Sequence, residues 1–346
     1  MTPPSRVSGR RTLAAITLAL AALGAALLPA LAQDAASPAP ASGSPTSSAP
    51  VEGKVTLYTS VTQDTIDAVL AALAATNPGL QVEVFRAPTG ELDARIATEQ
   101  RSGGVGADVL WVSDPLSLQR YAAEGMLAPL SGEGLAAVPP EYRTETSVGT
   151  RLLNLVMVAG QDVDPKPVDW ADLADPAYAG AVALPDPGFA GSAFAALGYF
   201  ASQDDLGMGF YQALKDNGAV QVSSPVDVMT GVAEGTYKAG ISLDKIVRDA
   251  MADGSPIEMV WPESGAIAVY SPAAVMATSD DAAAAQAFVE FLVSTEGQEA
   301  IAADGWQPVR ADVEWSESGT AVTPDWTAMF GSQDALLEGY RAIFGD

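Results

Sequence analysis

Hydroxyl, glycine and carboxyl residues recur in this sequence directly after short apolar runs. Hydroxyl groups and the free N–H groups of helix N-termini bind oxyanions such as phosphate or phosphonate, and a carboxylate binds an ammonium group. Serine, threonine and aspartate are also ordinary helix N-caps, so each residue taken singly has a purely structural interpretation. Their recurrence after successive runs favours a binding site. The residues are Thr59, Ser60, Thr62, Ser113, Asp114, Gly191, Ser192 and Asp244.

Aromatic residues are further candidates for the same site, Trp261 and Tyr270 first among them. Phe189, Tyr199, Trp261 and Tyr270 lie in or near loops that could line it, and an aromatic face stacks on a cationic or planar ligand. Trp261 is therefore expected to change its surroundings when ligand binds. Trp111 stands inside a strand-like run and is expected in the core, and Trp306 is expected to pack a C-terminal helix.

The composition excludes several kinds of chemistry. The 346 residues include no Cys and no His, so they cannot form a disulfide, a Cys/His zinc site or a Ser-His-Asp triad. No G-x-S-x-G or G-x-x-x-x-G-K motif occurs, and Asp204-Asp205 is interpreted as a solvated loop. The formal net charge of −26 opposes binding to nucleic acid or to an anionic membrane surface. A binding protein without a cofactor, not an enzyme, is the interpretation these absences favour.

The N-terminus has the pattern of an export signal. Arg6, Arg10 and Arg11 precede an apolar run that ends in Ala30-Leu31-Ala32, which is a signal-peptidase pattern. We interpret residues 1–32 as a cleaved signal peptide, exported by the general or the twin-arginine route; a membrane anchor is the alternative. No Cys follows, so a lipoprotein anchor is excluded. The Pro/Ser/Ala-rich residues 33–52 are predicted to be a disordered tether.

Strands and helices are predicted to alternate from residue 53 onward. The first strands are expected at 55–58, 80–85 and 108–112, with helices at 62–75 and around 92–99. The pattern returns later, with strands at 181–184 and 239–242 that precede helices at 191–202 and up to 251, and a last helix is expected at 335–344. This order predicts an α/β protein with two doubly wound lobes. Ligands of such sheets bind beyond the carboxyl ends of the strands, where the hydroxyl-rich loops lie.

Several segments resemble the extracellular solute-binding proteins of bacterial ABC importers. They are VTLYTS (55–60), ADVLWVSDP (107–115), DLADPAYAG (172–180) and FLVSTEGQ (291–298), and the resemblance covers nearly all of residues 53–313. It points to the branch with the ferric-ion, thiamine and 2-aminoethylphosphonate receptors. The resemblance implies a type 2 periplasmic binding protein fold, with one lobe at 53–157 and 268–346, the other at 158–267, a ligand cleft between them, and hinge strands near 152–158 and 267–275. It also implies a periplasmic monomer that delivers a small molecule to a permease in the inner membrane.

The resemblance leaves the ligand open. The iron-binding histidine, glutamate and tyrosine pair of the ferric receptors fall near Thr62, Ser113, Lys245 and Ile246, and none is retained. The favoured ligand is therefore a small oxyanion-bearing zwitterion or amine, similar to 2-aminoethylphosphonate, with its amine at Asp244. Ferric iron is an alternative if Asp114, Asp244, Glu263 and Tyr199 or Tyr270 form a replacement site. A sensory ligand-binding module of the same fold is another.

Overall fold

The computed structural model describes residues 51–316 and 319–345, which belong to one compact unit. The predicted signal peptide lies outside the described residues, as does the predicted tether except for residues 51 and 52. In the part of the chain that the structure describes, no helix is both long and apolar enough to cross a membrane.

The first part of the chain folds into three strands that are each followed by a helix; the sequence predicts the three strands and the first two helices. The elements are β1 (Gly53–Thr59), α1 (Gln63–Thr76), β2 (Leu80–Arg86), α2 (Thr89–Arg101), β3 (Val109–Trp111) and α3 (Pro115–Ala123). β1 lies between β2 and β3 and is parallel to both. Apolar residues at helical spacing bury one face of α1, through Ile66, Val69 and Leu73. We call this part of the sheet and its helices the first lobe.

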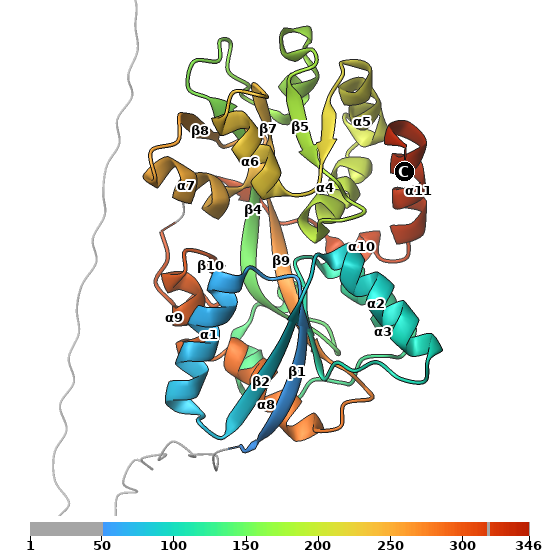
Figure 1. The fold of residues 1–346 in the computed structure, drawn as a ribbon, viewed down its shortest axis with the longest axis vertical. Helices are drawn as coiled ribbons and strands as arrows, with labels where there is room; N and C mark the ends of the chain where they lie inside the picture. The colour runs from blue at the N-terminus through green and yellow to red at the C-terminus, as the bar shows by residue number, and fades with distance from the viewer. Residues whose placement is uncertain (1–50, 317–318, 346) are drawn as a thin grey trace, which may run out of the picture. The chain divides into compact units, whose positions relative to one another are not determined.

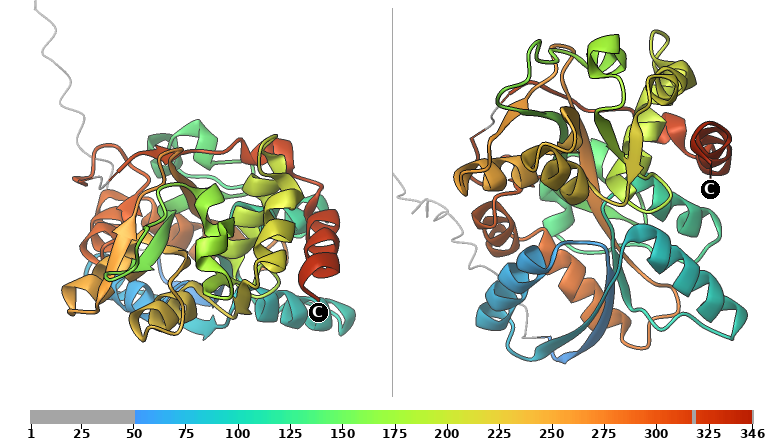
Figure 2. Two further views of the ribbon diagram at one scale, coloured as in Figure 1. Left: turned by 90° about the horizontal axis from the view of Figure 1, so that it is seen from above. Right: turned by 45° about the horizontal axis from the view of Figure 1, so that its top comes forward.

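A second set of three parallel strands forms the second lobe. Its elements are β5 (Val182–Pro185), α4 (Gly191–Ser202), α5 (Gly207–Asp216), β6 (Val220–Val222), α6 (Pro225–Ala233), β7 (Ala239–Leu243) and α7 (Asp244–Ala252). β5 lies between β6 and β7. The predicted strands at 181–184 and 239–242 and the helices that follow them are confirmed. Figures 1 and 2 show the helices of this lobe packed around its strands.

Two long strands join the lobes. β4 (Val148–Gly160) and β9 (Ala266–Val275) are antiparallel neighbours at the centre of the sheet, whose main order is β2-β1-β3-β9-β4-β7-β5-β6. β4 is buried from Val148 to Ala159, and both strands run from the first lobe into the second (Figure 1). The predicted hinge segments 152–158 and 267–275 lie inside them. Three short strands complete the sheet: β8 (Ile257–Val260), β10 (Gln307–Pro308) and β11 (Ala321–Val322).

The C-terminal part of the chain contacts both lobes. Its helices are α8 (Ala282–Leu292), α9 (Thr295–Ala303), α10 (Trp326–Met329) and α11 (Gln333–Phe344). α8 and α9 pack on the first lobe, against β1 and α1, whereas α11 packs against α4 and α5 of the second (Figure 2). The Tyr340 ring of α11 meets the Tyr211 ring of α5 edge to face at 5.3 Å. The assignment of all of 268–346 to one lobe stays a prediction.

Candidate functional site

A cavity of about 170 Å³ lies where the parallel strands of both lobes end. Loops that follow β1, β2, β3, β5, β6 and β7 all contribute to its wall, and β4 and the segment before β10 complete it. The carboxyl ends of parallel strands are where ligands bind in open α/β sheets. The lining residues are Ser60, Thr62, Arg86, Pro88, Thr89, Ser113, Arg151, Leu153, Phe189, Ala190, Gly191, Ser192, Ser224, Pro225, Val226, Leu243, Ile246 and Trp306.

The lobes touch beside this cavity. The backbone N–H of Gly90, in the first lobe, donates to the carbonyl of Phe189, in the second, at 3.3 Å. Arg248 of α7 donates from Nη2 to the carbonyl of Gly305 at 2.6 Å. The structure therefore shows the lobes in mutual contact, with the cavity between them.

Five of the predicted site residues line the cavity. Ser60, Thr62 and Ser113 belong to the first lobe, and Gly191 and Ser192 belong to the second. The hydroxyls of Ser60 and Ser113 lie 2.9 Å apart, and the Ser113 N–H donates to Ser60 Oγ at 3.0 Å. These contacts fix two hydroxyl groups from adjacent strands at one point of the wall.

The N-terminus of α4 forms another part of the wall. Its N-cap residue, Ala190, provides no side-chain cap, and Gly191 and Ser192 open the helix at the cavity. The first N–H groups of an uncapped helix and its dipole favour an anion.

Three predicted residues lie outside the cavity lining because their side chains are buried in the protein core. Thr59 is wholly buried and donates from Oγ1 to the Trp111 carbonyl at 2.7 Å. Asp114 is buried and caps α3, since its Oδ1 accepts from Ser117 N at 2.8 Å. Burial raises the pKa of Asp114 to about 7, and the hydrogen bonds from Ser117 oppose the shift. Tyr270 is a core residue of β9 whose ring contacts that of Tyr142 at 5.7 Å, and burial raises its pKa.

Asp244 and Trp261 lie together in a separate, much smaller pocket. They line it with Asn154, Gln307 and other residues. Asp244 Oδ2 lies 3.5 Å from Arg248 Nη1 and accepts from Asn154 Nδ2 at 3.4 Å. Burial raises the pKa of Asp244, and the Arg248 charge opposes this. The predicted oxyanion residues and the predicted amine residue therefore do not share one cavity.

Two arginines and a threonine of the cavity wall were not predicted from the sequence. Arg86 is exposed and donates from Nε to the Val61 carbonyl at 2.7 Å. Thr89 is buried, and its Oγ1 has no hydrogen-bond partner among the described residues. The third, Arg151, is only 1% exposed although it carries a charge. A cation inside the apolar run of β4 was the sequence signal that could have identified it.

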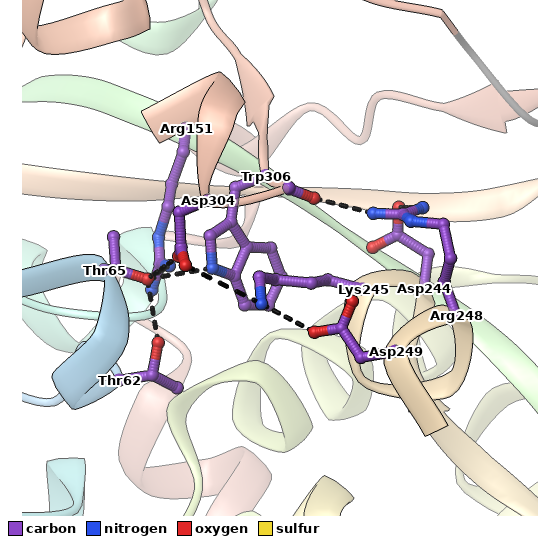
Figure 3. Close-up of polar contacts among 10 residues, drawn as sticks. Thr62, Thr65, Arg151, Asp244, Lys245, Arg248, Asp249, Asp304 and Trp306 are labelled. Atoms are coloured by element: carbon purple, nitrogen blue, oxygen red, sulfur yellow. Dashed lines mark hydrogen bonds and ion pairs between the residues drawn. The ribbon is translucent and has the colours of Figure 1, made fainter. Parts of the chain in front are cut away.

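The Arg151 side chain is held by one hydrogen bond and by contacts with the rings of Trp111 and Trp306. Its Nη1 donates to Thr65 Oγ1 at 3.1 Å, and its guanidinium lies over the Trp306 ring at 4.4 Å from the centroid (Figure 3). Its Nε is buried and has no partner in the described part of the chain. Burial lowers the pKa of Arg151 to about 9, and Asp304 opposes the shift, so the group is charged at neutral pH. The described lining of the cavity includes no carboxylate to balance it.

A hard-cation site is not assembled in the cavity. Asp114, Asp244, Glu263, Tyr199 and Tyr270, the residues considered for ferric iron, are all absent from its described lining. Within residues 51–316 and 319–345, no group of three or more acidic side chains is placed to hold a metal ion. The wall instead combines hydroxyls, backbone N–H groups and guanidinium groups, which are donors to anions.

Two α/β lobes with a cavity between them, joined by long strands, define the class of two-lobed solute-binding proteins. Residues 55–307 match the family model described as "Bacterial extracellular solute-binding protein", and the chain belongs to this family. Its fold is that of the type 2 periplasmic binding proteins.

Individual relatives are distant. A sulfate-binding protein of Synechocystis is 25% identical over 268 residues, which are 73% of this chain and 72% of the relative. Iron-bound HitA from Pseudomonas aeruginosa is 24% identical with a TM-score of 0.72, over 84% of this chain and 99% of HitA. AfuA from Actinobacillus pleuropneumoniae, with fructose-6-phosphate bound, is 18% identical with a TM-score of 0.76, over 85% and 99%. At these sequence identities the structural similarity shows a shared fold alone.

Proposed function

We propose that this protein is the periplasmic substrate-binding component of an ABC importer and that it captures a small solute with an oxyanion group in the cavity between its lobes. The observation that carries the proposal is the charge of Arg151, which is buried in the wall of a cavity whose described lining has no carboxylate.

A buried charge without full pairing is unfavourable, because the interior solvates it poorly. Arg151 has one hydrogen-bonded nitrogen, at Thr65, and a buried Nε that no described residue satisfies. A phosphate, phosphonate, sulfate or carboxylate group would supply both the charge and the acceptors, in charge-assisted hydrogen bonds. Thr89 Oγ1, the serine hydroxyls and the N-terminus of α4 add donors around the same space.

The position of Asp244 changes the preferred ligand. A zwitterion remains compatible with the cavity, but its amine would not reach a carboxylate of the described lining. The oxyanion group is therefore the part of the ligand that the proposal requires. The sulfate-binding relative and the AfuA complex with fructose-6-phosphate also concern oxyanion-bearing solutes, which supports this choice.

The proposed cycle needs binding and release but no catalysis. After removal of the predicted signal peptide, the monomer would bind its solute in the open cleft, close by bending of β4 and β9, and dock on the permease. Family membership supports the role in import.

Calorimetry of the processed protein tests the proposal. Sulfate, phosphate, 2-aminoethylphosphonate and fructose-6-phosphate are titrated separately, and ferric citrate is titrated in parallel. We expect at least one oxyanion to bind, and Arg151→Met to weaken it by at least about tenfold. Thr89→Val tests the same wall if Arg151→Met does not fold. Arg101→Met, at the C-terminal end of α2, is the matched control. Binding of ferric citrate alone would overturn the proposal.

A further inference from the structure

Two basic side chains of α7, in the second lobe, contact the turn that follows α9 on the first lobe. Lys245 Nζ lies 3.8 Å from Asp304 Oδ1, and Arg248 Nη2 donates to the carbonyl of the next residue, Gly305 (Figure 3). Gly305 has φ of +91°, and a Cβ there would lie 3.4 Å from Lys245 Cε. The lysine stem therefore passes directly over this turn when the lobes touch.

Asp304 is also connected to the cavity. Its Oδ2 accepts from Thr65 Oγ1 at 2.6 Å, and the same Thr65 oxygen accepts from Arg151 Nη1 at 3.1 Å (Figure 3). Because the single hydroxyl proton of Thr65 is directed to Asp304, Thr65 Oγ1 acts as the acceptor toward Arg151 and toward Thr62 Oγ1, which lies 2.8 Å away. Trp306 Nε1 donates to Thr65 Oγ1 as well, at 3.0 Å, which holds the group in place. Asp304 therefore interacts with two cations: with Arg151 through Thr65, and with Lys245 of the second lobe directly.

We propose that Asp304 is a positioning residue and that closure of the lobes changes the cation with which its carboxylate mainly interacts. In the open protein Asp304 balances Arg151 through Thr65; in the closed protein Lys245 shares the Asp304 charge, and Arg151 is left to bind the oxyanion. This inference rests on the proposed function, since it assigns the way in which closure prepares that site.

Burial strengthens the electrostatic attraction between Lys245 and Asp304. The side chains of Lys245 and Asp304 are only 13% and 11% exposed, so solvent and salt screen their attraction less than that of a surface pair. Asp304 also interacts electrostatically with Arg151, whose pKa it keeps from falling further. A second cation near Asp304 weakens the hold of that carboxylate on Arg151.

Lys245 also has a closer carboxylate partner within its own helix while the lobes touch, since its distance to Asp304 is 3.8 Å. Its Nζ donates to Asp249 Oδ2 at 2.7 Å, one helical turn along α7. Opening therefore leaves Lys245 paired within its own helix. Breaking the contact between Lys245 and Asp304 therefore costs little free energy, so closure can be reversible. We call this contact the latch.

The first experiment measures the lobes without any ligand. The chain has no Cys, so the double variant Ala71→Cys and Ala252→Cys, at exposed positions of α1 and α7, accepts two spin labels specifically. Pulsed electron paramagnetic resonance then gives the distance between the lobes. We expect Lys245→Met to shift the distribution to longer distances, and Asp249→Asn to leave it unchanged or shift it to shorter ones. An unchanged distribution in Lys245→Met would overturn the latch.

The second experiment separates the link to Arg151 from a plain effect of net charge. With sulfate and 2-aminoethylphosphonate as probes, Lys245→Met is expected to weaken binding about five- to tenfold. Adding Asp304→Asn to Lys245→Met should restore most of the loss, because no carboxylate then competes for Arg151. Adding Asp249→Asn makes the same charge change without the link and should restore little. Equal recovery in the two double variants would overturn the inference.

The two experiments also distinguish the inference from the proposed function. If sulfate, 2-aminoethylphosphonate, phosphate and fructose-6-phosphate all fail to bind any variant although the labels report the latch, the proposed ligand class is wrong and the latch stands. If the probes bind the unmodified protein and Lys245→Met changes neither distance nor affinity, the proposed function stands and the inference is wrong.

Discussion

Gly191, the first residue of α4, lies directly against the carboxyl group of Asp114 in the other lobe. A Cβ on Gly191 would lie 2.3 Å from Asp114 Oδ2 and 2.7 Å from Thr89 Oγ1. Real Cβ atoms do not approach oxygen so closely, so only glycine permits this contact between the lobes. Gly191 thereby brings the N-terminus of α4 to the cavity wall.

Gly191→Ala is therefore expected to weaken closure without damage to the second lobe. The methyl group would push α4 away from Asp114 and reduce oxyanion affinity by about tenfold or more, whereas alanine suits a helix at least as well as glycine does. Calorimetry with the tightest-binding oxyanion and a thermal melt measure the two effects. Gly209→Ala, in α5 with nothing within 4 Å of its Cβ position, is the control. A normal affinity in Gly191→Ala would show that the contact is not needed for binding.

Asp114 should make stability depend on pH. Its pKa is raised from 3.8 to about 7 in the folded protein, so between these values the folded state keeps a proton that the unfolded state has lost. Stability contributed by this group is therefore present at low pH and is lost as pH rises from about 4 to about 7. The shift corresponds to about 4 kcal/mol at most.

Asp114→Asn removes this titration and should gain stability relative to the unmodified protein as pH rises through that window. Denaturant unfolding at pH 4, 5.5 and 7.5 measures the difference. Asp281→Asn, at the partly exposed N-cap of α8, is the matched substitution and should show a smaller change. A constant difference between Asp114→Asn and the unmodified protein at all three pH values would contradict the assignment.

Asp244→Ala is expected to affect folding stability more than ligand affinity. The substitution removes the buried partner of Arg248 and Asn154 and should lower the free energy of unfolding by about 1–3 kcal/mol. Because Asp244 is not part of the cavity lining, affinity for sulfate or phosphonate should change less than about threefold. Asp253→Ala, at the exposed end of α7, controls for loss of an acidic residue. Unchanged stability with strongly reduced affinity for an amine-bearing ligand would restore Asp244 as an amine contact.

The sequence predicted the alternation of strands and helices because each element carries a local signal. The periodic apolar residues of α1 and the turn that follows it are examples, since they determine the helix without reference to distant residues. The central strands were located inside apolar runs for the same reason. Their pairing, which unites both sets of parallel strands into one sheet, depends on contacts between residues more than 100 positions apart.

The cavity residues were predicted in part for a physical reason. Ser60, Thr62, Ser113, Gly191 and Ser192 lie in loops that follow strands or at the start of the next helix, so the rule for carboxyl ends places them correctly. The rule does not say whether a side chain turns to the cavity or to the core. Thr59 and Asp114 also stand at strand ends, but they satisfy the backbone beneath the wall.

Arg151 was missed because its role depends on the partners it lacks as much as on those it has. Nothing local distinguishes an arginine of a buried strand that pairs with a carboxylate from one that faces a cavity. The distinction comes from Thr65 and Trp306, which contact the guanidinium, and from Asp304, which acts on it through its charge; Asp304 and Trp306 lie far along the chain from Arg151. Tertiary structure was needed to see it.

Tryptophan fluorescence should report binding through Trp306 and not through Trp261, which the sequence had favoured. Trp306 lines the cavity under Arg151, whereas Trp261 lies in the separate pocket beside Asp244. An oxyanion that pairs with Arg151 changes the field at the Trp306 ring, so the emission of the unmodified protein should shift or change in intensity on titration with the oxyanion that binds in calorimetry.

Trp306→Phe should remove most of that change, and Trp261→Phe should retain it. Because Trp306→Phe also loses the hydrogen bond to Thr65, its ligand affinity is measured by calorimetry, so that a lost signal is separated from lost binding. We expect the affinity of Trp306→Phe to fall only a few-fold, since the ring beneath Arg151 is kept. A ligand-induced signal that survives in Trp306→Phe and disappears in Trp261→Phe would place the moving tryptophan in the other pocket and contradict the site described above.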